Sequence, residues 1–270
     1  MNTGSLEGKI EEIIVGLDGR AGVVIRDFGS GWTFARREAE VFPAASLIKL
    51  AIIGELFRRI ELGELNLAGG VTIGPADRVG GFGILKELHA GIEVTLEDLA
   101  TLMIIVSDNT ATNLLIDRLG IDFINRHIDS LGLGQTRLQR KMMDVEAARA
   151  GRDNFTSPAD MARWLEGLVS PQGTQVAAAS QAKILDIMKR QQVNTKLPAL
   201  LPPGTTVAHK TGDLPGVEHD VGFIYIPAEN GTSNPVLVAV MTADLKDNSQ
   251  GIRAIGLIGR DVYDHFAPGS

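Results

Sequence analysis

The strand-like segments of this chain lie at its two ends, and this placement constrains the fold more than any other feature. Near the N-terminus the pattern predicts strands at 22–27 and 32–35, with a glycine-rich turn between them. Three further strands are predicted near the C-terminus, at 205–210, 220–226 and 235–243. Because a long section of helical pattern separates the two groups, we expect the terminal strands to pair into one antiparallel sheet. Helices at 6–15 and 247–264 would cover that sheet.

The middle of the chain, from Ser46 to about Ser130, has a helical pattern. The stretch TLEDLATLMIIVS opens with a capping box from Thr95 to Asp98, and the helix in NTATNLLIDRLG ends at Gly120. An ordered polar loop is expected at 134–158, followed by helices at 158–169 and 174–191.

We therefore predict an α/β (α+β) fold with two lobes that together make one catalytic domain. Residues 1–40 with 200–270 would form a discontinuous α/β lobe, and residues 41–199 a helical lobe. An active site would lie in the cleft between sheet and helical lobe.

Composition excludes several classes of function. The 270 residues are 44% hydrophobic and 22% charged, as in an ordinary soluble globular protein. A net charge of −7 argues against nucleic acid or an anionic membrane as the main partner. No apolar run approaches the roughly 18 residues of a membrane span, and no secretory leader is visible. The chain has no cysteine, which excludes disulfides and thiol catalysis and leaves the compartment open. The histidines at 89, 127, 209 and 265 have no ligand spacing, so we expect no metal and no other cofactor.

One apolar helical run, FPAASLIKLAIIGEL at 42–56, contains a lysine that is expensive to bury. Ser46 and Lys49 are three residues apart, so their side chains lie on the same face of the helix. A lysine in an apolar site has a lowered pKa and can act as the base that a serine nucleophile needs. The same spacing arises by chance, and it recurs at Ser180 and Lys183, where a solvated helix face explains it.

Two more strings strengthen the catalytic interpretation: SDN at 107–109 and KTG at 210–212. In the order serine-lysine, SDN, KTG, the chain resembles the class A β-lactamases and penicillin-binding proteins. MIIVSDNTATNLLID and TSPADMARWL are similar to the helices of the same family, and the resemblance extends over nearly the whole chain from about residue 20. It implies the two-lobed β-lactamase/transpeptidase-like fold.

The resemblance also implies catalytic roles. Ser46 would be the nucleophile that forms an acyl-enzyme, and Lys49 its base. Ser107 would relay a proton to the leaving nitrogen, and Lys210 would supply positive charge near both hydroxyls.

Substrate-binding roles follow in the same way. Asn109 would hold the side-chain amide of the substrate together with Lys49, and Thr211 would bind the substrate carboxylate. The backbone N–H groups of Ser46 and Asp213 would form the oxyanion hole.

The chain departs from the family in the loop at 134–158, where class A enzymes carry a glutamate that activates the deacylating water. Counting from Arg137 places Met142 at that site, and counting back from Pro158 places Lys141 there. Glu146 is a possible deacylation acid, although a solvated loop acid is the simpler interpretation. The usual Arg–Asp clasp of the loop would pair Arg140 with Asn154, and Asp153 is the alternative partner.

A second departure follows KTG, where His219 stands at about the position of the arginine that supports the substrate carboxylate. The histidine would either bind that carboxylate or be bonded structurally on a strand; the residues leave both open.

The acylation residues are complete, whereas the usual deacylation residue is missing. We therefore expect a serine hydrolase that acylates readily with β-lactams and releases them slowly. One alternative is a D,D-peptidase or esterase-like penicillin-binding enzyme; another is a β-lactam sensor module that is acylated once. The expected partner is a small-molecule lactam, peptide or ester, the expected state is a monomer, and the resemblance suggests a periplasmic or secreted location if a leader was removed.

Overall fold

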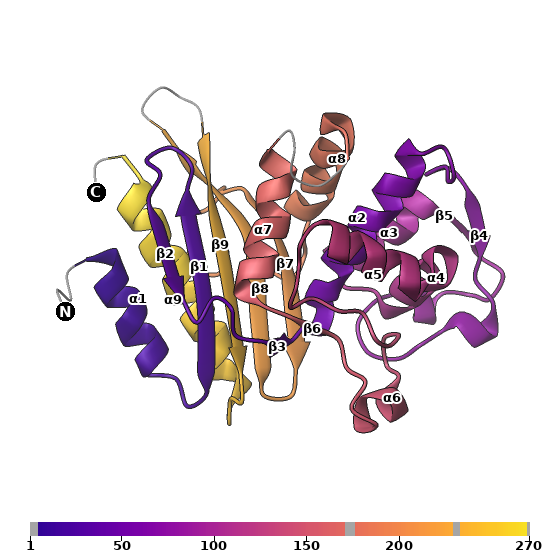
Figure 1. The fold of residues 1–270 in the computed structure, drawn as a ribbon, viewed down its shortest axis with the longest axis horizontal. Coiled ribbons are helices and arrows are strands. Elements are labelled where there is room, and N and C mark those ends of the chain that lie inside the picture. Colours follow the sequence, from indigo (N-terminus) through magenta and orange to yellow (C-terminus); the bar gives the residue numbers. More distant parts are fainter. Residues whose placement is uncertain (1–4, 171–175, 229–232, 269–270) are drawn as a thin grey trace.

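The computed structural model describes residues 5–170, 176–228 and 233–268, which form a sheet lobe and a helical lobe side by side (Figure 1). The helices are α1 (Leu6–Val15), α2 (Ile48–Glu61), α3 (Leu96–Ile105), α4 (Asn109–Leu119), α5 (Ile121–Ser130), α6 (Val145–Arg149), α7 (Pro158–Val169), α8 (Ala178–Lys189) and α9 (Asn248–Phe266). The strands are β1 (Arg20–Asp27), β2 (Thr33–Arg36), β3 (Phe42–Pro43), β4 (Gly70–Thr72), β5 (Glu93–Thr95), β6 (Phe155–Thr156), β7 (Val207–Leu214), β8 (Val217–Pro227) and β9 (Ser233–Ala243).

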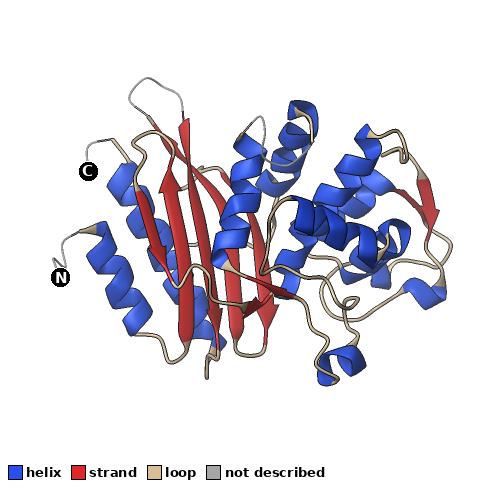
Figure 2. Ribbon diagram, in the orientation of Figure 1, coloured by secondary structure: helices blue, strands red, loops and turns tan. Residues whose placement is uncertain are grey.

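The terminal strands form one antiparallel sheet of order β2-β1-β9-β8-β7, which confirms the predicted fold class (Figure 2). The two ends of the chain meet where β1 pairs with β9, from Arg20 opposite Ala243 to Asp27 opposite Val236. This pairing leaves β7, which carries the KTG string, at the edge of the sheet beside the helical lobe.

Both faces of the sheet are buried, so its central strands are apolar on both sides. In β9, Val236, Val238 and Val240 pack with α1 and α9, whereas Leu237 and Ala239 belong to the core shared with the helical lobe. The predicted terminal helices therefore cover one face, and α7 lies on the other (Figure 1).

The helical lobe is built around α2, which is buried over most of its length. The capping box at Thr95 and Asp98 opens α3, and α4 ends at Gly120, both as predicted. A β4–β5 ribbon and loops replace helix between α2 and α3, because this stretch is rich in glycine, which favours turns over helix.

Two other segments differ in detail from the sequence prediction. The loop at 134–158 contains the short helix α6, capped by Asp144. The predicted helix 174–191 is seen from Ala178, and residues 174–175 lie outside the described part of the chain. Helices α7 and α8 pack against the sheet, and the lobe boundaries at 41 and 199 stay a prediction. Of the helices described, none has both the length and the apolar character needed to cross a membrane.

Candidate active site

Ser46 lies in a short 3-10 turn, Ala45–Leu47, that leads directly into α2. Ala45 has a φ of +45°, an unfavourable conformation for a residue with a side chain. Strain of this kind persists only where the surroundings hold it. The turn is held by Ala44 N–H, which donates to Asn154 O at 2.7 Å, and by the close approach of β7. A Cβ built on Gly212 would lie 3.2 Å from Ala45 Cβ, so only a small residue lets the strand pass here.

Lys49 is fully buried one turn after Ser46. Its Nζ donates to Ser107 O at 2.8 Å, to Ser107 Oγ at 3.0 Å and to Asn109 Oδ1 at 3.0 Å. Burial, and secondarily the nearby Lys210 ammonium, lower the pKa of Lys49 well below its usual value. A lowered pKa favours the neutral amine that a base requires more than it would be favoured in a solvated lysine.

Ser107 lies between α3 and α4 with a φ of +55°, which turns its side chain toward the two lysines. The next residue, Asp108, caps α4 by accepting from Ala111 N–H at 2.9 Å. It also accepts from the backbone N–H groups of Ile84 and Leu85 at 2.7 and 2.9 Å. The aspartate of SDN therefore fixes Ser107 and also anchors the loop at 80–85 to the site.

Lys210 reaches the same hydroxyl from β7. Its Nζ donates to Ser107 Oγ at 3.1 Å and to Thr211 O at 2.8 Å. Burial lowers the pKa of Lys210 to about 7, against the opposing effect of Asp213. With both lysines donating, the Ser107 oxygen has its lone pairs occupied, and its own hydrogen is available for a third partner.

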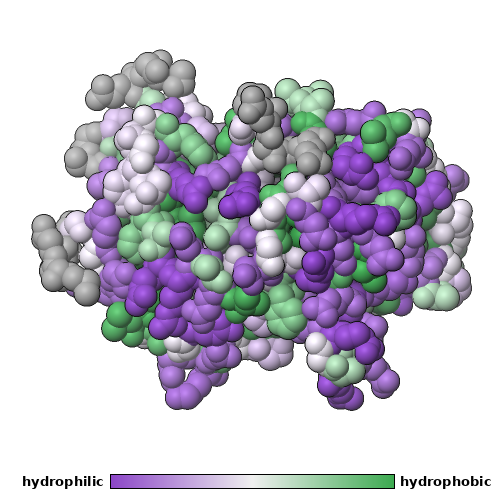
Figure 3. Space-filling view, in the orientation of Figure 1, coloured by the Kyte–Doolittle hydropathy of each residue, from purple (hydrophilic) through white to green (hydrophobic). Residues whose placement is uncertain are grey.

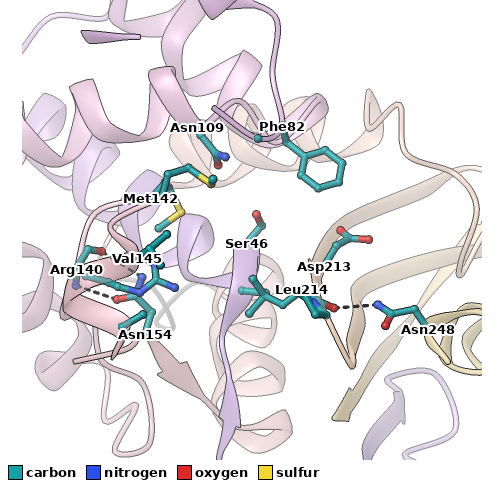
Figure 4. A pocket seen from close by; sticks show the side chains of 15 residues that line it. Ser46, Phe82, Asn109, Arg140, Met142, Val145, Asn154, Asp213, Leu214 and Asn248 are labelled. Atoms are coloured by element: carbon teal, nitrogen blue, oxygen red, sulfur yellow. Dashed lines mark hydrogen bonds between the residues drawn. The ribbon is translucent and has the colours of Figure 1, made fainter. Parts of the chain in front are cut away.

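The Ser46 hydroxyl makes no hydrogen bond to any described residue and projects into a cavity of about 750 Å³ (Figure 4). The lining residues are Ala45, Ser46, Gly81, Phe82, Asn109, Arg140, Met142, Met143, Val145, Ala148, Asn154, Asp213, Leu214, Pro215 and Asn248. The structure therefore brings together the predicted Ser46, Asn109 and Asp213 at this cavity, with Lys49, Ser107 and Lys210 bonded to one another through the network described above.

Thr211 is fully buried, and its hydroxyl has no hydrogen-bond partner among the described residues. A buried hydroxyl without a partner costs free energy unless a ligand completes it. Thr211 is not among the residues that line the cavity, so its binding role stays a prediction.

Lys196 is a buried lysine that the sequence reasoning missed. Its Nζ donates to Gly212 O at 3.0 Å and His219 O at 3.1 Å, and it pairs with the carboxylates of Asp213 at 2.8 Å and Glu218 at 2.6 Å. Lys196 thereby fixes the end of β7 that carries Asp213. No periodic pattern marks this residue, because it lies in the irregular connection NTKLPAL.

Asn248 was also missed, and it acts on the same strand end. Its Nδ2 donates to Leu214 O at 2.9 Å, and its Oδ1 accepts from Gly216 N–H at 2.8 Å. The first residue of α9 thus holds the β7–β8 turn at the cavity wall (Figure 4).

The 134–158 loop presents Met142 to the cavity. Lys141 points elsewhere, since its Nζ bonds Asp117 Oδ2 at 2.7 Å near the surface. Glu146 is exposed on α6 and is not among the lining residues, which fits the solvated alternative. Arg140 pairs with Asp153 at 2.8 Å, the alternative partner considered for the loop clasp.

His219 is fully buried and bonded within the protein. Burial lowers its pKa to about 4, so the ring is neutral. Nε2 lies 2.8 Å from Pro43 O, and Nδ1 lies 2.9 Å from Glu218 O and 3.2 Å from Thr242 N. Both ring nitrogens are therefore engaged within the protein, which corresponds to the structural alternative.

The sequence as a whole matches the model of the Beta-lactamase enzyme family over residues 5–266. The chain belongs to this family. Within the family's fold, a β-lactamase from Sphaerobacter thermophilus is 34% identical, with a TM-score of 0.87 over 97% of this chain and 98% of that one. PBP-A is 31% identical, with a TM-score of 0.85 over 97% and 95%. An ancestral class A β-lactamase (GNCA) is 29% identical, with a TM-score of 0.86 over 97% and 100%. These matches confirm the resemblance seen in the motifs and identify a β-lactamase-like serine hydrolase that acts on small molecules.

Replacing Lys196 by Met should lower the free energy of unfolding by about 3–5 kcal/mol, because Asp213 and Glu218 lose their buried counter-ion. Lys246→Met, which breaks an exposed pair with Asp18, should change it by less than about 1 kcal/mol. Urea unfolding of both variants measures this. Equal stabilities would contradict the role assigned to Lys196.

The lowered pKa of Lys210 predicts a stability that rises with pH. Between its folded pKa of about 7 and its unfolded value near 10.5, the unfolded chain binds a proton that the folded chain does not. The free energy of unfolding should therefore increase by up to about 1.4 kcal/mol per pH unit in this window. In Lys210→Met the increase should be smaller by that amount, whereas Lys246→Met should follow the wild type. The free energy of unfolding is measured by urea unfolding at several pH values in this window. If it rises equally with pH in wild type and Lys210→Met, the prediction is wrong.

Proposed function

We propose that this enzyme forms an acyl-enzyme on Ser46 with β-lactams and hydrolyses it slowly. The observation that carries the proposal is the convergence of Lys49 and Lys210 on Ser107 Oγ, at 3.0 and 3.1 Å, beside the cavity into which Ser46 projects.

We assign the acylation step to residues in and beside the cavity. Lys49 in its deprotonated form takes the proton of Ser46, whose oxygen attacks the lactam carbonyl. The backbone N–H groups of Ser46 and Asp213 donate to the oxyanion, and the start of α2 favours negative charge there. As the lactam C–N bond breaks, Ser107 gives its proton to the leaving nitrogen, and the hydroxyl recovers a proton from the lysine network. The unpaired Thr211 hydroxyl would bind the substrate carboxylate.

Deacylation lacks a comparable base. Along the loop wall the cavity is lined by Met142, Met143, Val145 and Ala148, none of which can accept a proton from water. Asp213 is the one carboxylate among the lining residues, and it is paired with Lys196. A water molecule beside the acyl-enzyme would therefore be activated poorly.

The second candidate is a D,D-peptidase or esterase-like enzyme for which β-lactams act as inhibitors. The apolar loop wall favours it, because an enzyme specialised for lactam hydrolysis needs a base there. PBP-A is a relative at 31% identity, and a PBP-A mutant is known as an acyl-enzyme complex with penicillin G. Both candidates share the acylation step.

Incubation with a penicillin should add the mass of the intact drug to Ser46, and Lys49→Ala should abolish this labelling while leaving the fold unchanged. Intact-mass spectrometry and circular dichroism measure the two effects. Lys183→Ala is the matched control, since Lys183 also follows a serine by three residues but pairs with Glu97 on the surface.

Three outcomes separate the possibilities. A persistent adduct supports the proposal. Rapid turnover without a detectable adduct would overturn slow deacylation, and neither adduct nor turnover would overturn acylation.

Met142→Glu should accelerate deacylation by at least about tenfold, because general-base catalysis typically contributes a hundredfold or more when well placed. Met142→Gln matches its shape without the base and should behave as the wild type. The decay of the adduct after removal of free drug measures the rate. Equal decay in the two variants would show that Met142 does not occupy the water-activating position.

A further inference from the structure

We propose that the cavity beside Ser46 selects substrates whose acyl group carries a bulky, uncharged apolar side chain, such as a medium-length alkyl chain or an aryl group. This inference rests on the proposed function, because it names the substrate class of the same nucleophile. Two observations support it: apolar side chains surround the mouth of the cavity, and the polar side chains in its lining other than Ser46 are already hydrogen-bonded within the protein.

Large apolar side chains are left about half exposed at the cavity mouth. Phe82 is 47% exposed, Met143 49% and Val145 50%, and all three line the cavity. The molecular face drawn in Figure 3 is mostly hydrophilic, with apolar residues in separate small patches. Exposed apolar groups that gather around a cavity mark a site where an apolar ligand binds.

These residues come from two segments that approach each other across the mouth. A Cβ built on Gly81 would lie 3.0 Å from Met143 Sδ, so the loop at 80–84 reaches the 134–158 loop. Figure 4 shows Ser46 between the side carrying Met142 and Val145 and the side carrying Leu214, with Phe82 above. An acyl group on Ser46 would therefore contact apolar atoms from several directions.

The polar side chains on the loop side already bond within the protein. Arg140 pairs with Asp153 and donates to Lys141 O at 3.1 Å. Asn154 Oδ1 accepts from Gln139 N–H at 2.7 Å, and its Nδ2 donates to Arg140 O at 3.2 Å. These groups hold the loop and are engaged before a substrate arrives.

The other amides in the lining are engaged in the same way. Asn109 accepts from Lys49 and donates to Gly80 O at 3.1 Å, and Asn248 bonds the β7–β8 turn. A charged or strongly polar acyl substituent would lose its hydration here and gain few new partners, whereas an apolar one is favoured by leaving water.

The apolar wall is held in position before substrate binds. Asn113 on α4 clamps the backbone of Met142, with Met142 N–H donating to Oδ1 at 2.8 Å and Nδ2 donating to Met142 O at 3.1 Å. Asp144 caps α6 through Ala147 N–H at 2.9 Å. A surface fixed in this way binds without the cost of ordering it.

A series of p-nitrophenyl esters, from acetate to octanoate, tests the inference. In the wild type, kcat/KM for acylation should rise about two- to fourfold per methylene until the chain fills the cavity. In the double variant Met143→Gln, Val145→Thr this dependence on chain length should fall by at least about half. Val169→Thr is the matched control, an exposed valine at the end of α7 that is outside the lining, and it should keep the wild-type dependence. A flat wild-type series, or equal dependence in the double variant and the wild type, would overturn the inference.

A second measurement separates this inference from the proposed function. Ser46→Ala cannot be acylated, and calorimetric titration with uncharged N-methyl amides of the same acids reports binding alone. Affinity should rise with chain length with a negative heat-capacity change, and both effects should weaken in the double variant. Rising affinity without any labelling of the wild type would refute acylation and support the apolar site. Labelling with no dependence on chain length in either measurement would refute the apolar site and leave acylation standing.

Discussion

Two buried lysine side chains donate to a single serine hydroxyl, and the rest of the site is arranged around the free energy of keeping them there. Lys49 and Lys210 are both fully removed from solvent, where an ammonium group is costly. Burial and their mutual repulsion lower the pKa of Lys49, and burial lowers that of Lys210 to about 7. The same free energy that destabilises the charged forms favours the neutral amine, which is the form that the base role proposed for Lys49 requires.

The two sides of the cavity have different character. On the β7 side, Lys196 and Asn248 hold the end of the strand that carries Asp213. On the side of the 134–158 loop, the cavity is lined by Met142, Met143 and Val145, whose side chains can neither donate nor accept a proton. Under the proposed function, such a site would form the covalent intermediate more readily than it releases it. The inferred role of this apolar side is to bind the acyl group of the substrate.

Much of the fold follows from the sequence because its determinants are local. The apolar strand segments at both ends, the capping box at Thr95 and Asp98 and the stop at Gly120 are all readable within a few residues. The pairing of the chain ends follows because the strands have no other partners. The β4–β5 ribbon between α2 and α3 was not predicted, because the helical pattern on both sides of this glycine-rich stretch dominated the sequence.

The candidate site divides in the same way. Ser46, Lys49, Ser107 and Lys210 carry spacings that a motif can record. Lys196 has no such spacing, since its partners at Gly212, Asp213 and Glu218 are fixed only by the folded chain. For His219, the residue type alone left both roles open, and the depth of burial and the Pro43 carbonyl favour the structural one. Long-range packing is the information that a single sequence lacks.

The pairing of β1 with β9 has a consequence for synthesis on the ribosome. Strand β1 emerges early and can form a hairpin with β2, but its other edge is completed only by residues 233–243. At typical elongation rates the intervening residues take on the order of ten to fifty seconds to appear. During that interval a strongly apolar strand has one open edge, the situation that invites association between nascent chains. A chaperone that covers β1 would therefore matter more for the yield of this enzyme than for its final stability.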